Sequence, residues 1–137
     1  MSENLDLVRS ISFERDDSGE RYVELFDPAI VLDNSTLPAP TAGVYRGHEG
    51  LRQFRREWLG AFETHHIDAE RFIDVGDVIV VGYRVTGRGM ASGAAVEMHR
   101  WNVYRVRNGL VIRIEIFETK AQALEAAGLS EDAHASS

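Results

Sequence analysis

Apolar residues recur at helical spacing in three stretches of the first half of the chain. The first stripe predicts a helix over residues 4–13. Asp17 and Glu20 stand at capping-box spacing and predict a second helix, which ends at residues 27–28. The third stripe predicts the longest helix, over residues 48–62. The apolar positions of the first and third stripes are Leu5, Val8, Ile11, Leu51, Phe54, Trp58 and Phe62.

The apolar period changes to two in the second half of the chain. It predicts four long strands that follow one another as an antiparallel meander. These strands cover residues 67–75, 78–88, 95–107 and 110–117. A shorter β-prone run over residues 29–32 precedes Asp33, and a proline- and glycine-containing loop follows it.

The segment after the meander predicts a short helix. Thr119 and Gln122 have the spacing of a capping box, and Gly128 stands at the C′ position. We therefore expect one domain over residues 1–129 and a frayed tail over residues 130–137.

The order of elements predicts an α+β fold in which helices collect on one face of a curved antiparallel sheet. The concave face of that sheet is the expected pocket. On the last strand Ile112, Ile114 and Ile116 alternate with Arg113, Glu115 and Phe117. We expect the isoleucines to form an apolar convex face through which two copies of the chain pair as a homodimer.

Composition narrows the list of partners. The 137 residues contain 15 Lys and Arg against 22 Asp and Glu, a net charge of −7, which disfavours nucleic acid as a partner.

The absence of cysteine excludes thiol chemistry and cysteine-type metal sites. The five histidines lack metal-ligand spacing, so no metal is expected. No export signal or membrane span is recognisable, and we expect a cytoplasmic protein.

Four motifs in this order carry a family resemblance: Leu25-Phe26-Asp27-Pro28, the segment 44–51 that opens the long helix, the segment 74–81, and the segment 106–111 that leads to 123–129. The chain resembles the nuclear transport factor 2-like superfamily, and within it the SnoaL-like group. That group includes ketosteroid isomerase, limonene epoxide hydrolase and polyketide cyclases. The resemblance implies a cone-shaped fold, helices on the concave side of the sheet, and a pocket that usually needs no cofactor.

The resemblance also implies catalytic positions. Comparison with ketosteroid isomerase brings Asp33 to the position of its base and Asn102 to that of its oxyanion-hole acid. Comparison with limonene epoxide hydrolase makes Arg84 and Glu115 similar to its arginine and one of its carboxylates. Polyketide cyclases also carry an acidic residue on the last strand, where Glu115 stands. We expect ligand-binding positions at Tyr45, Trp58, Arg100, Tyr104 and Phe117.

Two of the catalytic candidates, Asp33 and Glu115, also have a structural alternative. Asp33 can close a turn through backbone N–H groups, and Glu115 can pair with Arg84, Arg100 or Arg113. Three function classes remain open. The chain can be an acid/base enzyme of the isomerase, cyclase or epoxide hydrolase type, a non-catalytic binder of a small hydrophobic molecule, or a dimerising interaction domain.

Overall fold

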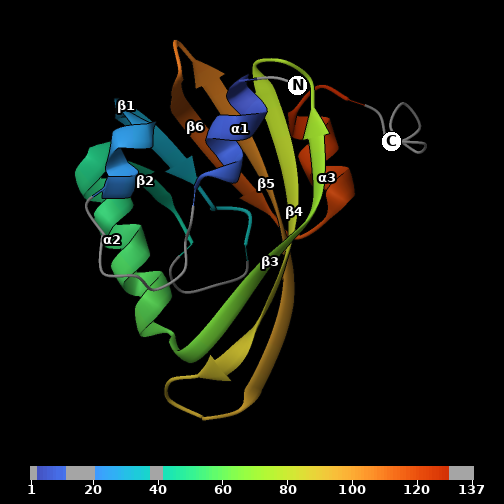
Figure 1. The fold of residues 1–137 in the computed structure, drawn as a ribbon. Helices are drawn as coiled ribbons and strands as arrows, with labels where there is room; N and C mark the ends of the chain where they lie inside the picture. Colours follow the sequence, from blue (N-terminus) through green and yellow to red (C-terminus); the bar gives the residue numbers. More distant parts are fainter. Residues whose placement is uncertain (1–2, 12–20, 38–41, 130–137) are drawn as a thin grey trace.

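The computed structural model describes residues 3–11, 21–37 and 42–129 of the chain. Three α-helices, one 3₁₀ helix and six strands make up this part (Figure 1). In chain order they are α1 (Glu3–Arg9), η1 (Arg21–Leu25), β1 (Phe26–Asp33), β2 (Val44–Arg46), α2 (Gly47–Gly60), β3 (Phe62–Asp74), β4 (Val78–Gly89), β5 (Ala95–Arg107), β6 (Leu110–Phe117) and α3 (Lys120–Ala126).

The six strands form one curved sheet in the order β2-β1-β6-β5-β4-β3. β3 to β6 are the expected antiparallel meander. β1 runs parallel to β6, so the sheet is mixed rather than wholly antiparallel. A parallel neighbour requires a crossover connection, and here the chain crosses from β1 to β6 through β2, α2 and the first three meander strands.

The larger core lies on the concave side of the sheet, under α1 and α2. Leu5 and Val8 come from α1, and Leu51 and Phe54 come from α2, which confirms the helical stripes of both segments. The sheet contributes alternate residues of each strand, because successive side chains of a strand point to opposite faces. These residues are Ile30, Leu32, Ile79, Val81, Tyr104, Val106, Val111, Ile114 and Ile116.

α3 lies on the other face of the sheet, which corrects the expectation that all helices gather on the concave side (Figure 1). Its Ala123 and Leu124 pack with Val80 and Val103, whose chain neighbours belong to the concave core. The predicted capping box is present, because the Thr119 hydroxyl accepts the backbone N–H of Gln122 at 3.2 Å. α3 therefore buries the apolar residues of the convex face.

The element bounds depart from the expectations mainly around residue 26. The segment expected to be a second helix is a 3₁₀ helix over Arg21–Leu25, and Phe26 already opens β1 opposite Val111 of β6. α2 ends at Gly60, and Phe62 begins β3 five residues before the expected start of that strand. The proposed caps at Asp17 and Glu20 and the tail 130–137 lie outside the described residues.

The described residues contain no helix that is long and apolar enough to cross a membrane. Within the same residues no group of three or more His, Asp or Glu side chains is arranged to hold a metal ion.

Candidate functional site

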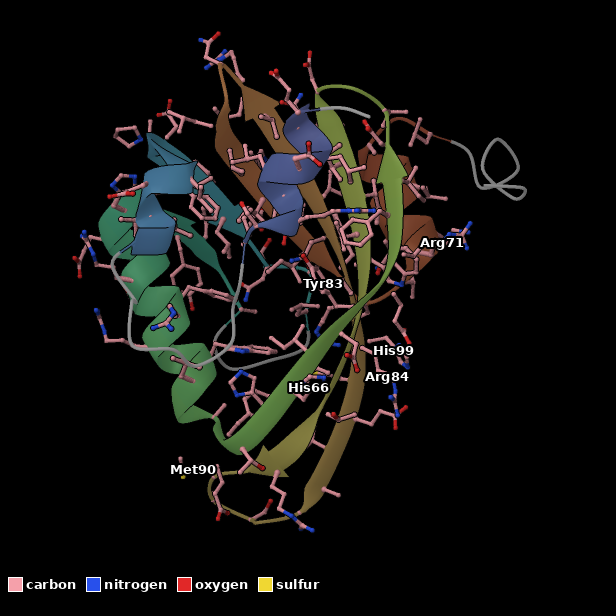
Figure 2. The ribbon with its side chains drawn as sticks, in the orientation of Figure 1. His66, Arg71, Tyr83, Arg84, Met90 and His99 are labelled. Carbon is pink, nitrogen blue, oxygen red and sulfur yellow. The ribbon has the colours of Figure 1, made fainter. Side chains whose placement is uncertain are left out.

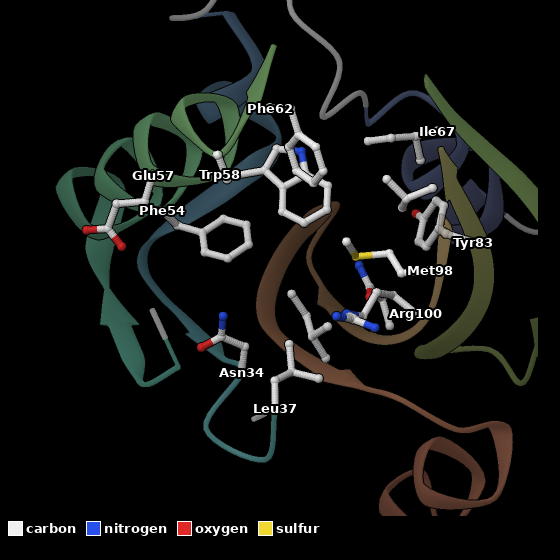
Figure 3. Close-up of a pocket in the computed structure, with 14 residues that line it drawn as sticks. Asn34, Leu37, Phe54, Glu57, Trp58, Phe62, Ile67, Tyr83, Met98 and Arg100 are labelled. Atoms are coloured by element: carbon white, nitrogen blue, oxygen red, sulfur yellow. The ribbon is translucent and has the colours of Figure 1, made fainter. Parts of the chain in front are cut away.

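A cavity of about 360 Å³ opens between α2 and the concave face of the sheet (Figure 3). Its size falls within the range of small-molecule sites, which are typically concave and mostly apolar with a few polar groups. The lining residues come from the β1–β2 loop, α2 and β3 to β6. They are Asn34, Leu37, Phe54, Glu57, Trp58, Ala61, Phe62, Ile67, Tyr83, Val85, Met98, Arg100, Asn102 and Ile116.

Aromatic rings form the helix side of the cavity. Phe54 and Trp58 stand one helical turn apart on α2 and stack with their planes 19° apart. The ring of Phe62, at the start of β3, lies 4.9 Å from that of Trp58. Such flat, rigid surfaces favour contact with planar apolar molecules.

Three polar side chains form a cluster at the sheet side. The hydroxyls of Tyr83 and Tyr104 are 2.7 Å apart, and Nδ2 of Asn102 donates to the Tyr104 hydroxyl at 3.1 Å. Asn102 is only 4% exposed, and within the described part of the chain its Oδ1 has no hydrogen-bond partner. A buried carbonyl oxygen without a partner costs stability and suggests a functional role.

Burial keeps both tyrosines of this cluster protonated. Burial raises the pKa of Tyr104 to about 12, although its hydrogen bonds with Tyr83 and Asn102 oppose the rise. Burial, together with the charge of a Tyr104 phenolate and the hydrogen bond to it, raises the pKa of Tyr83 well above 10. At neutral pH the cluster therefore offers neutral hydroxyl groups, which donate hydrogen bonds but do not act as bases.

Two charged residues line the cavity as well. Arg100 lies on β5 between Met98 and Asn102, and burial lowers the pKa of its guanidinium. Glu57 lies on α2, where its carboxylate accepts hydrogen bonds from the Tyr45 hydroxyl at 2.6 Å and from Gln53 at 2.9 Å. These two bonds lower the pKa of Glu57, and Figure 3 shows its carboxylate pointing away from the cavity.

The structure brings three of the expected site residues together around the cavity: Trp58, Arg100 and Asn102. Tyr104 lies directly behind them, fully buried and bonded to Asn102. Tyr45 is one layer further away, where its ring meets Phe54 edge-on at 5.4 Å.

The expected carboxylates lie on the opposite, convex face. Asp33 accepts the backbone N–H and the hydroxyl of Ser35 at 2.9 and 2.6 Å, so it closes the turn after β1. Its other oxygen is 3.3 Å from Arg113, which also reaches Glu115, and Glu115 reaches Arg105 at 3.5 Å. Asp33, Arg113, Glu115 and Arg105 thus form an ionic ladder across β1, β6 and β5.

This geometry corrects the expectation that Asp33 and Glu115 project into the cone. Burial alone would raise the pKa of Asp33, but the two hydrogen bonds from Ser35 and the charge of Arg113 outweigh it and lower the pKa. A carboxylate held in this way is stabilised in its ionised form by the protein itself. The contacts of Asp33 with Ser35 agree with the structural alternative, in which Asp33 closes a turn.

Arg84 and Phe117 also face away from the cavity. Figure 2 shows Arg84 and Tyr83 on opposite sides of the sheet. Arg84 is partly exposed and pairs with Glu97 at 3.2 Å, so the expected network of Arg84 and Glu115 in the cone is wrong. Phe117 packs against the cluster that α3 covers.

The expected isoleucine face is wrong as a surface for pairing. Ile114 is fully buried and Ile116 is 6% exposed, both in the concave core. The convex positions beside them hold Arg113 and Glu115 instead. Homodimerisation stays a prediction, and sedimentation at micromolar concentration tests it.

Sequence reasoning missed three important residues of the site: Glu57, Tyr83 and Met98. The pairing of residues across the β4–β5 hairpin could have identified Tyr83. Tyr83 lies opposite Arg100 in the observed register, and directly opposed residues share one face of a sheet. Once Arg100 is placed in the cavity, Tyr83 follows.

Solved structures share this fold. An NTF2-like protein of unknown function from Burkholderia pseudomallei matches at 21% identity and TM-score 0.71, over 91% of this chain and 97% of that one. A putative SnoaL-like polyketide cyclase from Jannaschia matches at 20% identity and TM-score 0.74, over 91% and 90%. The protein TerC, co-crystallised with polyporic acid, matches at 17% identity and TM-score 0.70, over 90% and 97%.

At these identities the likeness establishes the fold, and a comparison with curated proteins finds no match. The sequence itself carries the family assignment. The family described as the SnoaL-like domain matches residues 9–114, from the end of α1 into β6, and thus spans most of the cavity wall. The chain therefore belongs to the SnoaL-like domain family.

Proposed function

We propose that the cavity binds a small, flat, largely apolar molecule. The observation that carries this proposal is a 360 Å³ cavity whose wall is aromatic and aliphatic, with the Asn102 amide and Tyr83 as polar groups at one side. A molecule with rings would lie against Phe54 and Trp58, and a polar substituent would meet the tyrosine–amide cluster. Two proteins of the same fold, a putative SnoaL-like polyketide cyclase and TerC, which was co-crystallised with polyporic acid, support this class of ligand.

An enzymatic version of this function would use the same cluster. When the Tyr104 hydroxyl donates to Tyr83, the Tyr83 hydroxyl keeps its own proton for a ligand, and such donors polarise a ligand carbonyl and stabilise charge that develops on its oxygen. In this version Asp33, Glu115 and Arg84 have no contact with the ligand, because they lie on the convex face. Catalysis would then depend on the tyrosine–amide cluster.

A thermal-shift screen with a matched pair of variants tests the proposal. The screen would include ketosteroids, epoxides and aromatic polyketide-like compounds, and each compound that stabilises the protein would be followed by mass spectrometry. Met98→Trp fills the cavity, whereas His99→Trp introduces the same ring at the next residue, on the exposed opposite face. A ligand at 100 times its Kd stabilises a protein by about 2.7 kcal/mol.

We expect ligands that raise the Tm of the wild type and of His99→Trp but not of Met98→Trp. Equal stabilisation of the two tryptophan variants would place binding outside the cavity and refute the proposal. A ligand recovered chemically altered would establish the enzymatic version, and one recovered unchanged would establish the binder.

A further inference from the structure

Arg100 stands out among the groups that line the cavity. Its neighbours on the same face of β5 are Met98 and Asn102, which also line the cavity. Figure 3 shows the Arg100 side chain near that of Met98 at the sheet side of the cavity. Its Nη1 donates one hydrogen bond, at 2.8 Å, to the carbonyl oxygen of His99. Glu118 acts on it electrostatically without forming an ion pair.

Arginines on the convex face of the same strands are arranged differently. Arg84 pairs with Glu97, Arg105 pairs with Glu115, and Arg113 pairs with both Asp33 and Glu115. Arg88 and Arg107, on β4 and β5, have no carboxylate partner within the described residues, but both are exposed to water, whereas Arg100 is half-buried at the cavity wall. Within the described residues, Arg100 makes no ion pair at all.

A guanidinium at the wall of an apolar cavity is costly to desolvate unless an anion compensates its charge. Arginine cannot relieve the cost by losing its proton, because a guanidinium stays protonated in proteins. Its planar N–H groups fit the two oxygens of a carboxylate or a similar oxygen acid. The uncompensated charge therefore favours a ligand that brings its own anion.

We propose that the ligand is an aromatic anion, whose ionised oxygen group pairs with Arg100 while its rings lie against Phe54 and Trp58. This inference rests on the proposed binding function and adds the charge of the ligand to it. The net charge of the chain, −7, repels anions at long range. Recognition of an anion would therefore be a local property of Arg100.

A pair of dyes that differ by one anionic group tests the inference. 1-Anilinonaphthalene-8-sulfonate is an anion, and N-phenyl-1-naphthylamine is the same ring system without the sulfonate. Both fluoresce when they enter an apolar cavity, so fluorescence titration gives the Kd of each. Arg100→Met is the test variant. Arg84→Met is the control, because it removes the same charge from the opposite face of the sheet.

We expect Arg100→Met to raise the Kd of the sulfonate dye at least 10-fold and to change the Kd of the neutral dye less than 3-fold. Arg84→Met should leave both dissociation constants within 3-fold of the wild type. Arg100→Gln, which keeps a polar side chain without the charge, should show the same loss of affinity for the sulfonate dye. It provides a second variant if Arg100→Met folds poorly.

The outcomes separate the two proposals. If the Arg100 variants bind the sulfonate dye as tightly as the wild type does, and Met98→Trp still abolishes binding of both dyes, the inference about charge is wrong and the binding function stands. If neither dye binds the wild type, or if Met98→Trp binds both dyes unchanged, the binding function itself fails and the inference fails with it.

Discussion

Replacing Asn102 by leucine should preserve or increase the stability of the unliganded protein, although it alters a buried residue of the site. The side chain donates one hydrogen bond to Tyr104, and its Oδ1 has no partner within the described residues. Leucine removes both the bond and the unpaired oxygen. The larger side chain has room, because Asn102 borders the 360 Å³ cavity.

The free energies of the two removed features favour the stability of Asn102→Leu. A typical hydrogen bond contributes about 1 kcal/mol net, whereas a buried polar group without a partner costs about 1–3 kcal/mol. We therefore expect Asn102→Leu to change the free energy of unfolding by between about zero and +2 kcal/mol. Tyr104→Phe should act in the opposite direction. It removes the hydroxyl that bonds to both Tyr83 and Asn102 and leaves the whole amide unpaired, at a cost of about 1–3 kcal/mol.

Urea unfolding at pH 7, followed by circular dichroism, measures both changes. A shift of the midpoint at an unchanged m-value reports a change in stability. If Asn102→Leu unfolds at lower urea than Tyr104→Phe does, Oδ1 must have a partner in the folded protein, and the reasoning about this site is wrong. If the stable Asn102→Leu variant also loses ligand affinity, the amide is retained for function at the expense of stability.

Three further predictions concern the scaffold. The pKa of Asp33 is lowered by folding, so the ionised carboxylate stabilises the folded protein fully above pH 3.8, and this stabilisation is lost as the pH falls through the lowered pKa. The loss of stability caused by Asp33→Asn, measured in urea, should therefore be present at pH 7 and shrink below pH 3.8. Gly82→Ala places a Cβ 2.7 Å from the Trp101 ring, so it should lower the Tm and alter the near-UV circular dichroism. Thr119→Ala removes the N-cap of α3 and should cost about 1 kcal/mol in urea unfolding.

Local patterns predicted most of the fold. The two strands 95–107 and 110–117 have the observed bounds, and the capping box at Thr119 is present, because turn residues and caps act within a few residues of the chain. The start of β1 depends instead on a distant partner. Phe26 is in a strand because it lies opposite Val111 in the parallel pairing with β6, and no local pattern specifies that pairing.

The cavity side of the sheet was harder to predict than the strands themselves, because apolar residues are buried on both faces of the sheet. α1 and α2 cover one face and α3 covers the other, so alternation of apolar residues does not identify the cavity side. Arg84 illustrates the difficulty. It lies opposite His99, and its chain neighbour Tyr83 lies opposite Arg100, so Arg84 and Arg100 must face opposite ways. The loop between β4 and β5 has no two-residue turn that would have fixed this register in advance.

A single extra residue in β6 turns Glu115 away from the cavity. Next to the Asn108-Gly109 turn, Val106 lies opposite Val111, and continuing that pairing would set Glu115 opposite Asn102, inside the cone. The register shifts between Arg105 and Val106, however, and Glu115 lies opposite Val103 instead. A bulge of this kind reverses the facing of every later residue in the strand. The same shift places Ile116 in the cavity wall and places Glu115 beside Arg113 and Arg105 on the convex face. The cavity side of β6 is therefore apolar, and it supplies no carboxylate to Arg100.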